Sequence, residues 1–362
     1  MTEQQAAATT GHFPCPSCGS RVEFAPGTTV LRCPYCGFEQ AVAAAATAIE
    51  EHSYEAWAAV PRKPVAQLGQ YVYKCQGCGA QTETSDLSSR CQFCGAPLIA
   101  DPGALQLIAP EAVLPFQVPR ERVREVFKKW VTSRWFAPTS LKKVASTEQL
   151  TGTYLPHWTY DSSTATRYTG QRGEHYYVTE TYVEDGQQKS RQVQKTAWYP
   201  AAGTVARDFD DVLVPATTTV PANRLAKLGP WVLSRAVPFQ RDYLSGYRTL
   251  RYDVEADSGL ESAKQQMQKV IHEDCERDIG GDEQRVSSMN THYAALMFKL
   301  ILLPVWIAAY LHAGKSWQVQ VNASTGEVIG DRPFSAIKIA AAAVAAIIAI
   351  VLIIVLVQVA KN

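Results

Sequence analysis

The chain has 362 residues, of which 46% are hydrophobic and 10% aromatic, and its formal net charge is +1 at pH 7. This length predicts two or three modules, since domains usually contain ~100–150 residues, and the aromatic content allows much of the chain to bury a core. The balanced charge excludes a global basic field that would attract nucleic acid or an acidic bilayer, so any such binding requires a local patch.

Cysteine usage indicates metal binding. Eight of the nine cysteines fall into four Cys-x-x-Cys pairs. A disulfide scaffold would be short, secreted and led by a signal peptide. Residues 1–11 are polar and rich in Ala and Thr, which predicts a disordered start without the apolar region of a signal peptide. We therefore expect a reducing compartment, in which thiolates are free to bind a metal.

Residues 12–40 are predicted to form a first zinc ribbon. Cys15 and Cys18 are separated from Cys33 and Cys36 by fourteen residues, and Gly19 and Gly37 follow the two pairs. A Cys-x-x-Cys turn places two sulfurs on one side of a metal, and the glycine permits the positive φ that this turn needs. Two such turns complete a tetrahedral site with metal–sulfur distances of ~2.3 Å.

Residues 71–100 are predicted to form a second ribbon around Cys75, Cys78, Cys91 and Cys94, with twelve residues between the pairs. A connector at 41–70 separates the ribbons. It is predicted as helix over 41–60, ending at Pro61 and Pro64. Each ribbon uses all four thiolates, so we predict two structural Zn²⁺ sites without an open position for a catalytic water. An iron site like that of rubredoxin and redox Cys-x-x-Cys pairs are the alternatives.

Residues 110–335 are predicted to form a central α+β domain. One helix begins at Pro119 and a second runs from about Ser258 to Arg277. Thr, Tyr, Val and Trp favour strands at 153–182, 189–215 and 315–330. The apolar stretch 296–311 contains Lys299 and Pro304 and is predicted to form buried strand, with a second membrane segment as the alternative.

This domain shows a weak internal repeat. A Pro-Phe-Gln motif, at 113–117 and again at 236–240, precedes each predicted helix, and a Leu-Pro-x-Trp motif, at Leu155 and again at Leu303, follows it. The repeat predicts two related halves. Chance similarity is the alternative, because Pro next to aromatic residues is common at strand starts.

The C-terminal segment is predicted to be a transmembrane helix at 337–359. Residues 339–357 are nineteen positions without a charge or a strongly polar group, which span about 28 Å as a helix. Arg332 and Lys338 precede this run, in agreement with a cytoplasmic body. We expect a tail-anchored, single-pass protein of the plasma (inner) membrane. A buried core helix is the alternative.

Other residues give weaker indications. Cys275 lies on the apolar stripe of the second helix and is predicted to be a buried thiol. An enzyme would require a cleft that gathers His157, Asp161 and Arg167, and a core histidine is the alternative for His157. We predict no catalytic residues and no small-molecule substrate. A basic run on the outer face of the first helix either is solvated or contacts anionic headgroups; its members are Arg120, Arg122, Arg124, Lys128 and Lys129.

Several long stretches resemble bacterial membrane-anchored zinc-ribbon proteins that are often labelled primosomal protein N′ (helicase)-like or TFIIB-type zinc-ribbon proteins. The stretches that carry this resemblance are Leu114-Pro-Phe, 129–136, 154–158, 167–173, 278–285 and 302–306. The resemblance implies a layout of zinc ribbons, an α+β domain and a membrane anchor. It also implies membrane-associated partners, either SPFH-type scaffold proteins or proteins like phage shock protein A. Helicase activity is not implied, because the sequence lacks a nucleotide-binding loop.

Two functions fit these features. The first is a non-enzymatic membrane adaptor or scaffold that recruits proteins at the cytoplasmic face. The second is a nucleic-acid-binding protein tethered to the membrane, in which Tyr35, Phe38 and Phe93 would stack on bases. The basic residues near the ribbons are few, which favours protein contact; they are Arg21, Arg32, Lys74 and Arg90.

Overall fold

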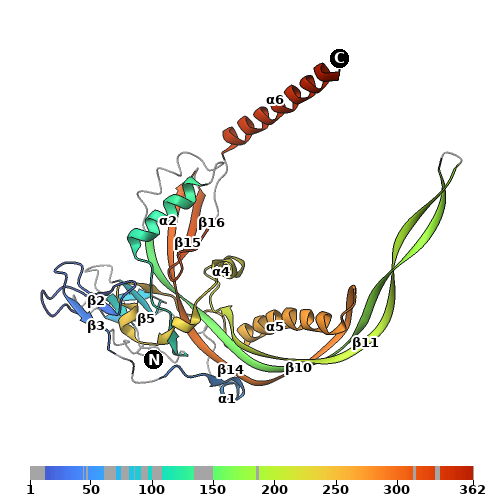
Figure 1. The fold of residues 1–362 in the computed structure, drawn as a ribbon. Coiled ribbons are helices and arrows are strands. Elements are labelled where there is room, and N and C mark those ends of the chain that lie inside the picture. Colours follow the sequence, from blue (N-terminus) through green and yellow to red (C-terminus); the bar gives the residue numbers. More distant parts are fainter. Residues whose placement is uncertain are drawn as a thin grey trace, which may run out of the picture.

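Three long antiparallel strands form the main feature of the computed structural model, and they curve into the arch seen in Figure 1. The central strand, β10 (Leu150–Glu184), pairs with β11 (Gln187–Pro215) on one side and β14 (Glu283–His312) on the other. Thr, Tyr and Val are frequent in these strands, because such side chains pack well on a pleated surface. The long strands confirm the strand predictions at 153–182, 189–215 and 296–311.

The structure describes residues 13–43, 45, 48–60, 71–74, 81–84, 86–90, 97–99, 108–133, 150–184, 187–312, 315–330 and 335–361. The helices are α1 (Tyr54–Ala58), α2 (Arg120–Thr132), α4 (Ala222–Leu228), α5 (Ala256–Ile279) and α6 (Ala336–Lys361), with short 3₁₀ turns at Leu233–Arg235 and Arg241–Leu244. The short strands are β1 (Glu23–Phe24), β2 (Val30–Arg32), β3 (Glu39–Ala41), β4 (His52–Ser53), β5 (Tyr71–Lys74), β6 (Gln81–Thr84), β7 (Ser88–Arg90), β8 (Pro97–Ile99), β9 (Ala112–Val113), β12 (Val237–Pro238), β13 (Arg248–Thr249), β15 (Lys315–Asn322) and β16 (Val328–Gly330).

The arch ends in a two-stranded ribbon. β14 accompanies β10 only as far as the pair Gly173–Glu283, whereas β11 continues to the pair Glu184–Gln187. Residues 174–184 and 187–197 therefore extend past the third strand, and we call this segment the ribbon. In Figure 1 it reaches away from the rest of the molecule, beyond α5.

The two Leu-Pro-x-Trp motifs lie side by side on neighbouring strands. Leu155 of β10 is directly opposite Leu303 of β14 in the antiparallel register. The strands that carry the two Pro-Phe-Gln motifs, β9 and β12, also pair with each other. The elements of the predicted repeat thus meet across the centre of the sheet.

Two helices cover different parts of the sheet. α5 packs along the inside of the arch, with a stripe of buried residues that starts at Ala256 and ends at Ile279. Gly259 allows its first turn to approach closely, since an added Cβ would lie 2.5 Å from the hydroxyl of Tyr160. α2 buries Val123, Phe127 and Val131 in the cluster that contains β15 and lies beside β16. Both helices confirm the sequence-based predictions.

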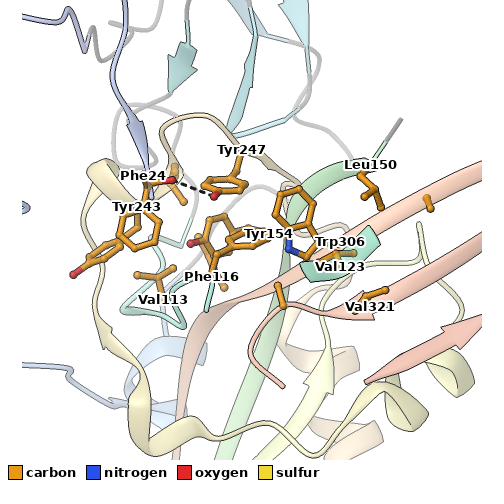
Figure 2. Close-up of a cluster of buried hydrophobic side chains, with 14 of the residues drawn as sticks. Phe24, Val113, Phe116, Val123, Leu150, Tyr154, Tyr243, Tyr247, Trp306 and Val321 are labelled. Atoms are coloured by element: carbon orange, nitrogen blue, oxygen red, sulfur yellow. Dashed lines mark hydrogen bonds between the residues drawn. The ribbon is translucent and has the colours of Figure 1, made fainter. Parts of the chain in front are cut away.

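An aromatic cluster joins these parts into one core (Figure 2). The ring of Phe116 stacks on Tyr247 at a centroid distance of 4.0 Å and meets the edges of Tyr154 and Trp306 at 5.0 and 5.2 Å. The hydroxyl of Tyr247 donates a hydrogen bond of 3.1 Å to the carbonyl of Phe24. The N-terminal segment is therefore packed into the same core as the long strands.

One prediction is corrected, and part of another is not supported. The connector 41–60 was predicted to be helical, but among its described residues only α1 is an α-helix. Ser53 caps this short helix, and the preceding strand β4 pairs with β14. The predicted helix at 337–359 is present as α6, but its predicted role as a membrane span is not supported. Among the described residues, no helix is both long enough and apolar enough to cross a bilayer.

Candidate metal centre

The first predicted ribbon folds as a small three-stranded sheet with two tight turns. β2 pairs with β1 on one side and β3 on the other. In each turn the glycine donates its N–H to the carbonyl of the first cysteine, from Gly19 to Cys15 at 2.9 Å and from Gly37 to Cys33 at 3.0 Å. Both glycines have φ near +70°, in the region that favours glycine. The expected geometry of both turns is thus present.

These turns bring four sulfurs together. The Sγ atoms of Cys15 and Cys36 are 3.5 Å apart, those of Cys18 and Cys33 are 3.7 Å apart, and all four lie within 4.8 Å of one another. A tetrahedral ion with metal–sulfur bonds of ~2.3 Å requires sulfurs ~3.8 Å apart. The quartet therefore fits one tetrahedral metal ion, and the four thiolates leave it no open coordination position.

The thiols differ in their readiness to lose a proton. The backbone N–H of Phe38 lowers the pKa of Cys36 to about 6. For Cys18, the N–H of Ser20 favours the thiolate, but the neighbouring thiol of Cys36 and the desolvation of the group outweigh it and raise the pKa to about 12. Without a metal the quartet thus retains protons, and metal binding must release them.

The metal centre is held against the rest of the molecule. Phe24 donates its N–H to the carbonyl of Ser245 at 3.0 Å, and the hydroxyl of Ser245 donates to the carbonyl of Val22 at 2.7 Å. The rings of Phe24 and Tyr243 meet edge to face at 5.0 Å (Figure 2). Cys15 and Cys33 are buried in the same cluster. A metal at this site would therefore stabilise part of the main core.

The second predicted quartet, Cys75, Cys78, Cys91 and Cys94, lies outside the described residues. Strands on either side of both pairs are described, and β5 pairs with β6 while β7 pairs with β8. In chain order, each of these Cys-x-x-Cys pairs thus falls between two antiparallel strands, as Cys33 and Cys36 fall between β2 and β3. β7 also pairs with β13, which connects this segment to the large sheet.

A second group of ligand-type side chains was not predicted. Carboxylates of Glu51, Asp161, Asp210 and Asp211 lie within 4.8 Å of one another. The ammonium of Lys299 lies 2.6 Å from an oxygen of both Glu51 and Asp211. The cluster therefore already contains a cation. The sequence signal for it was Lys299 itself, the one charge in the apolar stretch 296–311, whose partners come from distant segments.

The residues considered for an enzymatic cleft do not gather. His157 is buried with its Nδ1 3.1 Å from the carbonyl of Leu155, and desolvation lowers its pKa to about 4. Arg167 is exposed and lies ten residues further along β10, which corresponds to ~33 Å in a strand. Asp161 belongs to the acidic cluster. Cys275 is buried in the α5 stripe, as predicted, and burial raises its pKa.

The chain is similar to a distant relative among known proteins. The chain is 24% identical over 249 residues to the uncharacterized protein YdjG of Bacillus subtilis (strain 168), which covers 68% of this chain and 70% of that protein. No family model matches the chain. No solved structure matches it either. The comparisons thus do not support the primosomal or TFIIB-type labels.

Proposed function

We propose that the chain is a non-enzymatic zinc-binding adaptor that recruits a protein partner at the cytoplasmic face of a membrane. One observation carries this proposal. The exposed large apolar side chains of the described residues gather on two protruding elements. Ten lie on α6, and five lie on the β10–β11 ribbon or at its base. The remaining two are Tyr35 and Val60. Large exposed apolar patches mark membrane or protein interaction sites.

The α6 part of the proposal concerns the membrane. Its exposed apolar side chains run from Val344 to Leu356 and lie on all sides of the helix. A helix that is apolar all round requires an apolar surrounding. We propose that this surrounding is the hydrocarbon of the plasma membrane.

The β10–β11 ribbon is proposed to contact the protein partner. Tyr176, Tyr177, Tyr182 and Val183 lie on the ribbon, and Tyr199 follows at its base. An isolated two-stranded ribbon is only marginally stable in water, and exposed tyrosines are frequent among the residues that dominate protein interfaces. SPFH-type scaffold proteins and proteins like phage shock protein A are the partners that the sequence resemblance suggests.

The metal is proposed to be zinc, bound at Cys15, Cys18, Cys33 and Cys36 and at a second quartet of Cys75, Cys78, Cys91 and Cys94. Four thiolates form a common structural zinc site. Since such a site has no open position, zinc would supply folding energy and rigidity. An iron-loaded protein would absorb visible light, whereas a zinc protein is colourless.

A pull-down of the full chain from detergent-solubilised membranes tests the adaptor function. We expect one or more stable protein partners to copurify. The double variant Tyr177→Ser/Val183→Ser should lose them while remaining in the membrane fraction. A conservative ribbon control, Thr181→Ser, should retain them. Recovery of the full chain in the soluble fraction, or the same partners with the double variant, would contradict the proposal.

Tyr35 favours a second candidate function, nucleic-acid binding at the first zinc ribbon. Tyr35 is 67% exposed, and the guanidinium of Arg21 lies 5.4 Å from the centroid of its ring. Arg21 is also paired with Glu23 at 2.7 Å, which reduces the charge it offers to a phosphate. A salt-dependent shift of labelled DNA or RNA by the full chain, abolished by Tyr35→Ala, would favour this function.

A further inference from the structure

The charge of the molecule is distributed unevenly between the α6 end and the arch. α2 and α4 together carry seven Lys and Arg residues against two Glu residues. α5, inside the arch, carries six acidic residues against three basic ones. The formal charge of the whole chain is only +1, so this separation is a local property.

Both basic helices lie next to the strand that leads to α6. α2 and α4 each contact β16, which ends at Gly330, and α6 begins at Ala336. Six extended residue steps cover at most ~20 Å, so the start of α6 lies within this distance of Gly330. Figure 1 shows α2 at the end of the body from which α6 extends, while α4 lies near the start of α5 and α5 lies within the arch, both farther from α6.

Three cations of α2 are available for a partner. The core-facing side of the helix is formed by Val123, Phe127 and Val131, and its charged residues are exposed, although Arg120 donates a hydrogen bond to the carbonyl of Leu150. Arg122 is paired with Glu125 at 2.7 Å. Arg124, Lys128 and Lys129 have no carboxylate partner within 4 Å in the part of the chain that the structure describes.

We propose that α2 contacts the anionic headgroups of the bilayer into which α6 inserts. This proposal rests on the proposed membrane function and adds a lipid preference and an orientation to it. Cationic side chains near an anionic lipid surface are attracted to it, and the attraction decays within a Debye length of about 10 Å. The acidic α5 would be repelled by the same surface. The arch and its ribbon would therefore be directed away from the bilayer, where a protein partner can reach them.

Flotation of the full chain with lipid vesicles tests the proposal. The probes are vesicles of phosphatidylcholine alone and vesicles containing about 30% phosphatidylglycerol, each at limiting lipid. We expect the partition coefficient to rise tenfold or more with the anionic lipid and to lose this gain in 0.5 M salt. The triple variant Arg124→Gln/Lys128→Gln/Lys129→Gln should lose most of the gain. The control Lys189→Gln/Lys195→Gln/Lys269→Gln, which removes three cations from the ribbon and α5, should keep it.

The outcomes separate this proposal from the membrane function. Equal binding of the wild-type chain to both vesicle types would overturn the lipid preference and leave the membrane role of α6 intact. Failure to bind either type would overturn both. Hydrogen exchange of the chain reconstituted in each lipid gives an independent measurement. The amides of α2 should exchange more slowly in the anionic vesicles while those of α5 remain unchanged, and equal exchange of α2 in both lipids would contradict the proposal.

Discussion

The ammonium group of Lys299 in β14 lies 2.6 Å from a carboxylate oxygen of Glu51, a residue 248 positions earlier in the chain. Glu51 directly precedes β4, which pairs with β14 at Met297 and Phe298. The ion pair and the strand pairing together hold the segment that follows the first zinc ribbon against the middle of the arch. Lys299 thus connects the metal-binding end of the chain to the long strands.

Replacement of Lys299 by methionine should destabilise the protein by ~1–3 kcal/mol, because the carboxylates left behind are partly exposed to water. The side chain is only 9% exposed, and its removal leaves four carboxylates close together without their cation. The matched control is Lys264→Met, since Lys264 pairs with Glu261 on the surface of α5 and such pairs contribute at most about 1 kcal/mol. Urea unfolding of both variants measures the difference. Equal small losses would show that the cluster does not depend on Lys299.

Asp161 should make the stability depend on pH. Burial, together with a hydrogen bond to Glu51, raises the pKa of Asp161 from 3.8 to about 7 in the folded chain. A carboxyl group whose pKa is raised by folding stabilises the fold fully below its unfolded pKa, and this contribution is lost as the pH rises through the folded pKa. The wild-type chain should therefore lose stability between about pH 5 and pH 8 through this group.

The variant Asp161→Asn tests this dependence. Asparagine keeps an acceptor for the N–H of Asp211, which lies 2.6 Å from Asp161 Oδ1, and cannot ionise. Relative to the wild type, the variant should gain several degrees in melting temperature from pH 5 to pH 8. The pKa of Glu51 is lowered in the folded chain, so Glu51 changes stability in the opposite direction only at lower pH. The pH range of 5 to 8 therefore isolates the contribution of Asp161. Asp208→Asn, on the exposed face of β11, is the control, and an identical pH response of both variants would refute the assignment to Asp161.

The sequence predicted those parts of the fold that follow from local pattern. The apolar spacing of α2 and α5 and the high β-propensity of β10 and β11 indicated these elements. Both cysteine turns of the first ribbon were also predictable, because Cys-x-x-Cys-Gly requires little more than its own residues. The connector was mispredicted as helix, since its alanine-rich start has high helix propensity but β4 pairs with β14 further on.

The features missed by the sequence depend on contacts between distant segments. Nothing local indicates that Glu51, Asp161 and Asp211 meet around Lys299, because their positions follow from the register of three long strands and one short strand. The same applies to the packing of Phe24 on Tyr243, which merges the metal centre with the main core. The ribbon could not be foreseen either, since its strands resemble those of an ordinary hairpin within a sheet.

Gly203→Ala should loosen the end of α5. A Cβ at Gly203 would lie 2.6 Å from the hydroxyl of Tyr168 and 2.7 Å from Asp278 Oδ2, atoms that share a hydrogen bond of 2.6 Å. We expect a loss of ~1–3 kcal/mol and faster hydrogen exchange in the last turn of α5. Gly229→Ala is the control, because its Cβ would meet atoms only at 3.8 Å or more. Unchanged exchange at Asp278 in Gly203→Ala would contradict this role of the glycine.

The number of bound metal ions tests the two proposed zinc sites separately. Elemental analysis of the purified wild-type chain should give two zinc ions, and Cys33→Ser and Cys91→Ser should each give one. The control Cys275→Ala removes a thiol that lies outside both quartets and should leave the count at two. Cys33→Ser should also lower the free energy of unfolding by several kcal/mol, because the first quartet is packed into the aromatic core through Phe24. A wild-type count of one, unaffected by Cys91→Ser, would eliminate the second site while leaving the first intact.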